Sequence, residues 1–324
     1  MHCGGNMDKT RHQALNFQSM VVACKNSEAK AIEAFGKAVL LFDTSDSLIL
    51  HISEYARLLE VGEHALSDAY YTLRPVFEAM AETVQVITWE DPLWPVQTKG
   101  FAYCPRFLYV RGDISLLGKP AISIIGTRSP SLEGLASAAV TANAIGSKGY
   151  VVVSGLAKGI DGVAHKTALS SGFPTMAVIG TPLESCYPLE HQALQQEIAE
   201  KGVVVSRFAP SEITQKWHFL LRNRLMSALS LASVVVEDKD GGGAVRQASF
   251  ALEQKKYLFV YQSSLDNRSV LWPRQFADQP RVFVVKKSQD IPRLLAKALD
   301  QNAGLREKTG NKEEKPLQLD LFSL

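Results

Sequence analysis

From residue 121 onward, short apolar runs alternate with longer amphipathic stretches, and this alternation constrains the fold more than any other feature. The short runs are rich in β-branched residues, and the stretches between them repeat apolar residues at helical spacing. Buried strands that alternate with helices form a parallel sheet covered on both faces, so the sequence predicts a doubly wound, mostly parallel α/β domain. The predicted strands are 121–125, 150–153, 175–179, 203–206, 233–237, 257–261 and 281–285, preceded by 84–89 and 107–113.

The alternating part is flanked by segments of different character. Residues 1–95 have mainly helical spacing and predict a small N-terminal helical domain. The doubly wound domain is expected over 96–290. The remaining part, 291–324, predicts a helix, then a polar flexible tether over 301–315, and a short apolar peptide at its end.

The composition indicates the general class of protein but does not identify a ligand. Of the 324 residues, 46% are hydrophobic and 21% are charged, which indicates a packed globular protein. The net charge is only +2, so a site for nucleic acid has to come from local clustering of cations. The four cysteines lie far apart, which favours reduced thiols in a cytoplasmic protein and no structural metal. No run is long and apolar enough for a membrane span, and we expect no membrane partner.

Two glycine-containing turns follow predicted strands. The first holds Gly126, Thr127 and Arg128, and the second, residues 154–161, reads Ser-Gly-Leu-Ala-Lys-Gly-Ile-Asp. Backbone N–H groups in such turns, together with a helix N-terminus, can hold an anion. Arg128 is then placed to pair with a phosphate. The alternative is an ordinary structural turn with a solvated arginine.

Neither turn has a standard nucleotide-binding pattern. The glycine spacing differs from the dinucleotide fingerprint, and the Walker A order is absent. We therefore expect no NAD, no other cofactor and no hydrolase of the P-loop type. His165, on the helix after the second turn, is interpreted as a packed histidine rather than a catalytic base, and Asp161 as a cap for that helix.

The third segment, residues 216–224, reads Lys-Trp-His-Phe-Leu-Leu-Arg-Asn-Arg. Phe219 and Arg222 share a helix face, with Lys216 near its start. An aromatic ring beside cations can stack a base next to its phosphate, which suits a single-stranded nucleic acid. The alternative places Phe219 in the core and the arginines in ion pairs with Glu237 or Asp238; we expect at least one arginine to hold the loops together.

These motifs, in this order, resemble the DNA-processing protein A family (DprA, also called Smf) over roughly residues 95–262. Further matching residues are Ala164-His165, Tyr187-Pro188 and Arg111-Gly112-Asp113. The resemblance implies an extended Rossmann fold that binds single-stranded DNA without acting as an enzyme, protects incoming strands and loads the RecA recombinase during transformation and recombination. It also makes a homodimer an expected assembly. Taking the resemblance and the third segment together, the predicted DNA-binding residues are Arg128, Ser154, Gly155, Lys158, Gly159, Lys216, Phe219, Arg222 and Arg224.

The chain departs from the family pattern at one edge of the predicted sheet. Where the family has a serine- and glycine-containing turn, residues 241–247 read Gly-Gly-Gly-Ala-Val-Arg-Gln. The Pro-Gly after the next strand is replaced by Tyr261-Gln262, and Arg207 interrupts a Ser-Glu-Phe-like stretch. These changes affect the predicted pocket more than the fold.

The terminal peptide is similar to the short motif by which bacterial proteins dock on the DNA polymerase sliding clamp. Two apolar side chains would fill a pocket while a glutamine hydrogen-bonds at its rim. The alternative is a tail strand that folds back onto the domain. The predicted clamp-binding residues are Gln318, Leu319, Asp320, Leu321 and Phe322.

Two rival functions remain open at this stage. A Rossmann-like protein that binds or cleaves nucleotides, in the manner of a phosphoribohydrolase, needs a carboxylate near a glycosidic bond, and Glu237 is the best candidate. In that case the glycines of 241–243 form a phosphate turn with Glu253 as a distant carboxylate. The second rival is an adaptor whose pocket has decayed and whose tail peptide carries the function.

Overall fold

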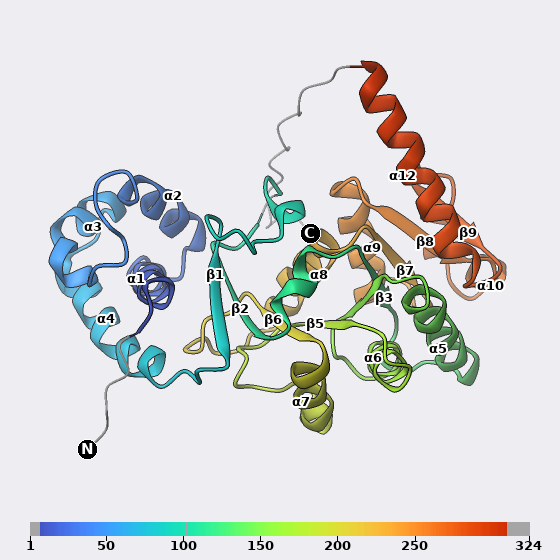
Figure 1. Ribbon diagram of the computed structural model, residues 1–324, viewed down its shortest axis with the longest axis horizontal. Helices are drawn as coiled ribbons and strands as arrows, with labels where there is room; N and C mark the ends of the chain where they lie inside the picture. Colours follow the sequence, from blue (N-terminus) through green and yellow to red (C-terminus); the bar gives the residue numbers. More distant parts are fainter. Residues whose placement is uncertain (1–6, 102, 310–324) are drawn as a thin grey trace.

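The computed structural model describes residues 7–101 and 103–309, and its centre is a nine-stranded sheet (Figure 1). The strand order is β1-β2-β6-β5-β4-β3-β7-β8-β9. Neighbours from β6 to β9 pair in parallel, while β2 pairs antiparallel with both β1 and β6. The predicted doubly wound, mostly parallel sheet is confirmed. The strands are β1 Val84–Thr88, β2 Phe107–Gly112, β3 Ala121–Ile125, β4 Val151–Ser154, β5 Thr175–Ile179, β6 Val203–Ser206, β7 Ala232–Val235, β8 Tyr257–Tyr261 and β9 Val282–Val285.

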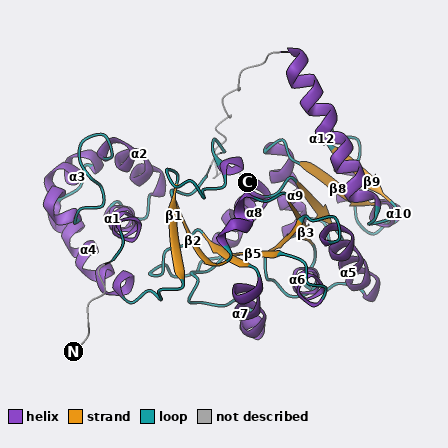
Figure 2. Cartoon of the chain, viewed as in Figure 1, coloured by secondary structure: helices purple, strands orange, loops and turns teal. Residues whose placement is uncertain are grey.

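Helices cover both faces of this sheet, as Figure 2 shows by colour. The central strands are buried on both sides, which explains why they read as continuous β-branched runs rather than as alternating ones. One face packs against α5, α6, α7 and α12, and the other against α8, α9 and α11. These helices are α5 Leu132–Gly146, α6 Ile160–Ser170, α7 Gln192–Lys201, α8 His218–Leu229, α9 Gly243–Glu253, α10 Gln262–Asp266, α11 Trp272–Phe276 and α12 Asp290–Thr309, with 3-10 turns η3 Ile114–Gly118 and η4 Leu189–His191.

The strand order reverses direction between β3 and β7. From β3 the chain proceeds outward through β4, β5 and β6, and it then returns to place β7 on the other side of β3. The loops after β3 and β7 therefore leave their strands in opposite directions and open a crevice between them. In doubly wound sheets ligands bind in this crevice, at the carboxyl ends of the strands.

Four N-terminal helices form a separate bundle that packs against the antiparallel edge of the sheet. Aromatic rings join the two parts: Phe17 and Phe35 contact Phe107 of β2, with ring centroids 5.4 and 5.8 Å apart, respectively. β1 belongs to the sheet, so the sheet begins before the boundary predicted at residue 95. The N-terminal elements are α1 Lys9–Ala23, α2 Glu28–Ala38, η1 Leu48–His51, α3 Ile52–Leu59 and α4 Glu63–Glu78, followed by η2 Val96–Thr98.

The last described helix, α12, is longer than the sequence pattern predicts. It continues to Thr309, so the predicted flexible tether over 301–315 is wrong for its first nine residues. The helix is anchored at its middle by a hydrogen bond from the hydroxyl of Tyr257 to the carbonyl oxygen of Ala298. The predicted clamp-binding peptide lies outside the described residues. None of the described helices is long and apolar enough to cross a bilayer.

Candidate nucleic-acid interface at the strand-order switch

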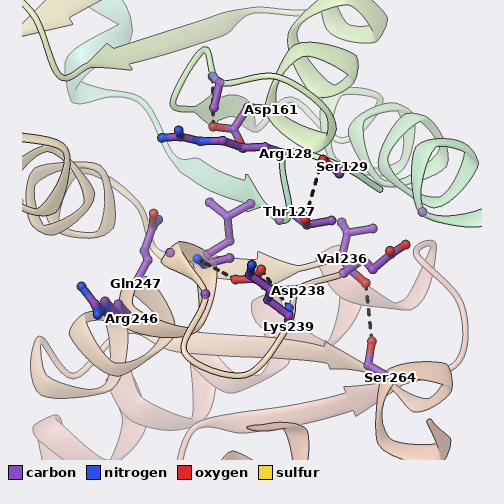
Figure 3. Close-up of a pocket in the computed structure, with 18 of the residues that line it drawn as sticks. Thr127, Arg128, Ser129, Asp161, Val236, Asp238, Lys239, Arg246, Gln247 and Ser264 are labelled. Carbon is purple, nitrogen blue, oxygen red and sulfur yellow. Dashed lines mark hydrogen bonds between the residues drawn. The ribbon is translucent and has the colours of Figure 1, made fainter. Parts of the chain in front are cut away.

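A pocket of about 870 Å³ opens at the switch between β3 and β7 (Figure 3). Its walls come from the turn after β3, the lead-in and first turns of α8, the loop between β7 and α9, and the segment around α10. Arg128, Lys216, Phe219 and Arg222 of the predicted site line this pocket. Ser154, Gly155, Lys158, Gly159 and Arg224 do not.

The first turn is fixed to the strand beyond it. The Thr127 N–H donates to the carbonyl oxygen of Glu237 (2.6 Å), and the Ser131 side chain caps α5 by accepting from the Gly134 N–H (3.0 Å). A Cβ at Gly126 would lie 2.5 Å from the Ile160 side chain, so only glycine fits there. This turn holds Arg128 in an exposed position at the pocket wall.

The close packing of the loops requires the glycines of the second turn. Gly159 has a positive φ of 75°, and a Cβ on it would lie 2.6 Å from the Thr127 carbonyl oxygen. A Cβ at Gly155 would collide with the Arg222 guanidinium. Ser154 is fully buried and donates to the Ile124 carbonyl oxygen (2.6 Å). The N–H groups of Gly155 and Ala157 in this turn donate to Asp161, while an anion contact at Lys158 and Gly159 stays a prediction.

Arg222 holds these loops together, as the sequence predicts for at least one arginine. Its guanidinium is buried and donates to the carbonyl oxygens of Gly155 and Val178, the latter at 3.0 Å. Asp161 is its electrostatic partner and accepts from the N–H groups of Gly155 and Ala157 (3.2 and 3.3 Å) rather than capping α6. Burial lowers the pKa of Arg222 to about 10, against the opposing effect of Asp161, so the side chain stays charged at neutral pH.

Three side chains, from two loops and from α8, form an aromatic and cationic cluster at the pocket rim. The rings of Phe219 and Tyr187 lie 5.3 Å apart, and the Arg128 guanidinium carbon lies 5.9 Å from each ring centroid. Phe219 packs over Gly180, where a Cβ would lie 2.6 Å from the ring. Tyr187 keeps about half of its surface exposed. The cluster offers ring faces beside a positive charge, which is the chemistry that stacks a base and holds its phosphate.

The other predicted cations divide into free and paired groups. Lys216 is exposed, and no ion pair involves it within the described part of the chain. Lys158 pairs with Glu190 (2.5 Å). Arg224 lies over Phe250, 4.1 Å from its ring centroid, and pairs with Glu253 at 3.4 Å. Arg224 is therefore a packing residue, and its partner is Glu253 rather than Glu237 or Asp238.

The carboxylates proposed for nucleotide cleavage have other partners. Glu237 accepts hydrogen bonds from the N–H and hydroxyl of Ser131, the latter at 2.7 Å. Asp238 accepts from the N–H groups of Ala244 and Val245 (2.9 and 3.2 Å), so a carboxylate of the protein fills the anion position at the start of α9. Glu253 lies at the far end of α9. A phosphate at the start of α9 would therefore have to displace Asp238 from the Ala244 and Val245 N–H groups.

His165 is packed, as the sequence predicts. It is fully buried, its Nδ1 lies 2.8 Å from the Thr175 hydroxyl, and burial lowers its pKa to about 3. Among residues 7–101 and 103–309, no three histidine, cysteine, aspartate or glutamate side chains are grouped so that they could hold a metal ion.

Sequence reasoning did not assign a site role to Tyr187, Lys239 or Arg246. Tyr187 enters through the loop after β5, and only its Tyr-Pro dipeptide marked it in the sequence. Lys239 and Arg246 line the pocket from the β7–α9 loop and the first turn of α9. Their segment stood out only as a departure from the family pattern.

A second cluster of charge lies under the segment that leads into α8. Glu212 accepts from the Ala209 N–H (2.8 Å), and its carboxylate is 3.9 Å from His218 Nε2. Arg207 donates to Glu28 of α2 (2.6 Å) and to the Tyr103 carbonyl oxygen (2.8 Å). Burial raises the pKa of Glu212 to about 7 and lowers that of His218 to about 4. This cluster ties the N-terminal bundle to the segment carrying Lys216.

Comparison with known sequences decides the family. A sequence model described as DNA recombination-mediator protein A matches residues 85–291, more than half of the chain. The chain belongs to this family. DprA of Bacillus subtilis is 35% identical over 184 residues, which cover 56% of this chain and 61% of that protein. DprA of Streptococcus pneumoniae is 34% identical over 54% of this chain and 62% of its own length. The chain thus spans about 60% of the length of these DprA relatives.

Solved DprA structures match the fold. DprA of Streptococcus pneumoniae aligns with a TM-score of 0.69 and 25% identity, over 88% of this chain and 95% of that one. DprA of Helicobacter pylori, described with a single-stranded DNA binding mode, aligns with a TM-score of 0.57 and 27% identity. That alignment covers 67% of this chain and 97% of the Helicobacter protein.

We predict that Arg222→Met destabilises the protein without any ligand present. The substitution leaves Asp161 buried without its partner and two carbonyl oxygens without a donor, which costs about 3–5 kcal/mol in the free energy of unfolding. Urea denaturation followed by circular dichroism measures this. The double variant D161N/R222M should recover part of the loss. An unchanged unfolding free energy in R222M would mean that the arginine does not hold the loops.

We also predict a pH dependence that originates at Glu212. Its folded-state pKa is raised above the usual 4.5, so it contributes stability at pH values below 4.5 that is lost as the pH rises through about 7. The melting temperature of the wild type should therefore fall between pH 5.5 and 8.5 relative to that of Glu212→Gln. Parallel curves for the two proteins over this range would contradict the assignment.

Proposed function

We propose that this chain binds single-stranded DNA in the pocket at the β3–β7 switch, without consuming it. The observation that carries the proposal is the cluster of Arg128, Tyr187 and Phe219 at the rim, beside the free cation Lys216. A base can stack on the exposed ring surface while its phosphate meets the guanidinium. Membership of the DprA family and the binding mode described for the Helicobacter relative support the same ligand.

Unpaired DNA fits this rim better than a duplex does. Stacking on Phe219 or Tyr187 requires a base whose face is free, and bases in a duplex are covered by their neighbours. The rim also offers charges at separate points rather than one enclosed anion position, which suits a polymer of phosphates. Of the predicted DNA-binding residues, the proposal keeps Arg128, Lys216 and Phe219 as contacts and gives Arg222 the role of a support.

We predict that Arg128→Ala and Phe219→Leu both weaken binding of fluorescent oligo-dT, measured by anisotropy. Losing the phosphate contact of Arg128 should lower the slope of log affinity against log salt by about 0.7 in magnitude. Losing the ring of Phe219 should cost about 1–3 kcal/mol with little change in that slope. Arg57→Ala, an exposed arginine on α3, serves as the control. Wild-type affinity in both site variants would refute the proposed site.

Further roles extend this proposal to partners. The family resemblance of the chain supports a role in which the protein protects the bound strand and passes it to the RecA recombinase. It also supports a dimer in which two copies of the chain associate through their Rossmann domains. The terminal peptide 318–322 adds docking to the sliding clamp as a proposal of its own. In this view the pocket holds the strand while the tail places the protein at the replication machinery.

Deleting residues 318–324 tests the clamp proposal separately from DNA binding. The truncated protein should lose binding to the sliding clamp in surface plasmon resonance, because the apolar side chains and the glutamine of the motif are gone. Its affinity for oligo-dT should not change. Equal clamp binding by the full chain and the truncated chain would exclude the peptide as a docking element.

A further inference from the structure

Arg246 is an unassigned cation inside the pocket. It lies in the first turn of α9, its side chain is exposed, and it lines the same pocket as Arg128 and Lys216. Within the described part of the chain, no hydrogen bond or ion pair engages its guanidinium. This separates it from Arg222, Arg224 and Lys158, whose charges are used by neighbouring groups of the protein.

The backbone at the start of α9 cannot bind a phosphate itself. The carboxylate of Asp238 already accepts from the Ala244 and Val245 N–H groups, and Gly242 leaves no room beside it. An anion in this part of the pocket therefore has to be held by side chains. Arg246 and Lys239 are the cationic side chains that this wall of the pocket provides.

The loop that leads into the N-terminus of α9 is also held in place. Asp240 accepts from the N–H groups of Leu271 and Trp272 (2.9 and 2.7 Å), and the Trp272 indole N–H donates to the Asp238 carbonyl oxygen (2.9 Å). These bonds tie the β7–α9 loop to the start of α11. Arg246 thus extends from a fixed helix turn, and ordering its side chain is the main cost of a contact with a ligand.

Arg128 and Arg246 come from opposite walls of the pocket. Figure 3 shows Arg128 reaching from the turn after β3 and Arg246 from α9, with both side chains ending on the same side of the pocket. A nucleotide within a strand has a phosphate on each side of its sugar, whereas a mononucleotide has only one phosphate. Two cations on facing walls therefore match a strand that passes between them.

We infer that Arg246 contacts a second backbone phosphate, so that the pocket selects an internal step of a single strand carrying two consecutive phosphates. This rests on the proposed function and adds the class of ligand that the site prefers. Arg128 holds the phosphate beside the stacked base, and Arg246 holds the neighbouring phosphate along the strand. Arg246, which lies in the segment 241–247 that departs from the family pattern, is then a binding residue.

The test compares Arg246→Gln, Arg128→Ala and the double variant in anisotropy titrations with fluorescent dT20. R246Q should weaken dT20 binding about tenfold, since it removes a charge-assisted contact. Each single variant should lower the salt slope by about 0.7 in magnitude, and the double variant by about 1.4. Arg268→Gln is the matched control, because this exposed arginine lies near the pocket without lining it.

Competition with short ligands separates one phosphate contact from two. Against labelled dT20, the wild type should bind pTpT more tightly than dTMP, and R246Q should lose most of that difference while keeping its affinity for dTMP. Wild-type affinity and slope in R246Q, alongside weakened R128A, would overturn this inference and leave the proposed function standing. An equal loss for dTMP and pTpT in R246Q would overturn the assignment to a second phosphate. Absence of dT20 binding by the wild type would remove the proposed function itself.

Discussion

The buried guanidinium of Arg222, with the Asp161 carboxylate as its electrostatic partner, supports the pocket rim. Arg222 reaches from α8 to the second turn and to β5, and Asp161 gathers the N–H groups of the same turn. A buried charge needs a partner and hydrogen bonds for all its polar atoms, or its desolvation outweighs the attraction. Here backbone groups supply most of those bonds. Arg222 therefore ties α8, which carries Phe219, to the second turn and to β5.

What distinguishes the cations of the site is which of them lack a partner in the protein, rather than the net charge of the chain. The chain as a whole carries only +2. Arg222 and Arg224 are used in packing, and Lys158 is balanced by Glu190. Arg128, Lys216 and Arg246 are exposed on three different elements around one pocket. A weak overall field with local free cations favours short-range contacts over the long-range attraction of an anionic ligand.

The N-terminal bundle is connected to the site although it lies largely outside the matched family region. Its aromatic rings pack on β2, and Glu28 pairs with Arg207 at the start of the segment that leads to Lys216. Glu212 and His218 lie between these parts, both with pKa values shifted by burial. The bundle thus contributes to the position of the pocket wall through charge and packing, without lining the pocket.

The sequence by itself determined the doubly wound sheet, the carboxyl-end turns and the segment with an aromatic beside cations, because strand and helix periodicity and turn residues are local signals. It also identified the family through spaced motifs. Only the tertiary structure decided which cations remain free, since Arg222 bonds to Gly155, 67 residues earlier in the chain. The same holds for Tyr187, which packs against Phe219 of α8, and for Asp238, which accepts hydrogen bonds at the start of α9. Which groups a side chain contacts depends on residues far apart in the sequence, and no local sequence pattern predicts these contacts.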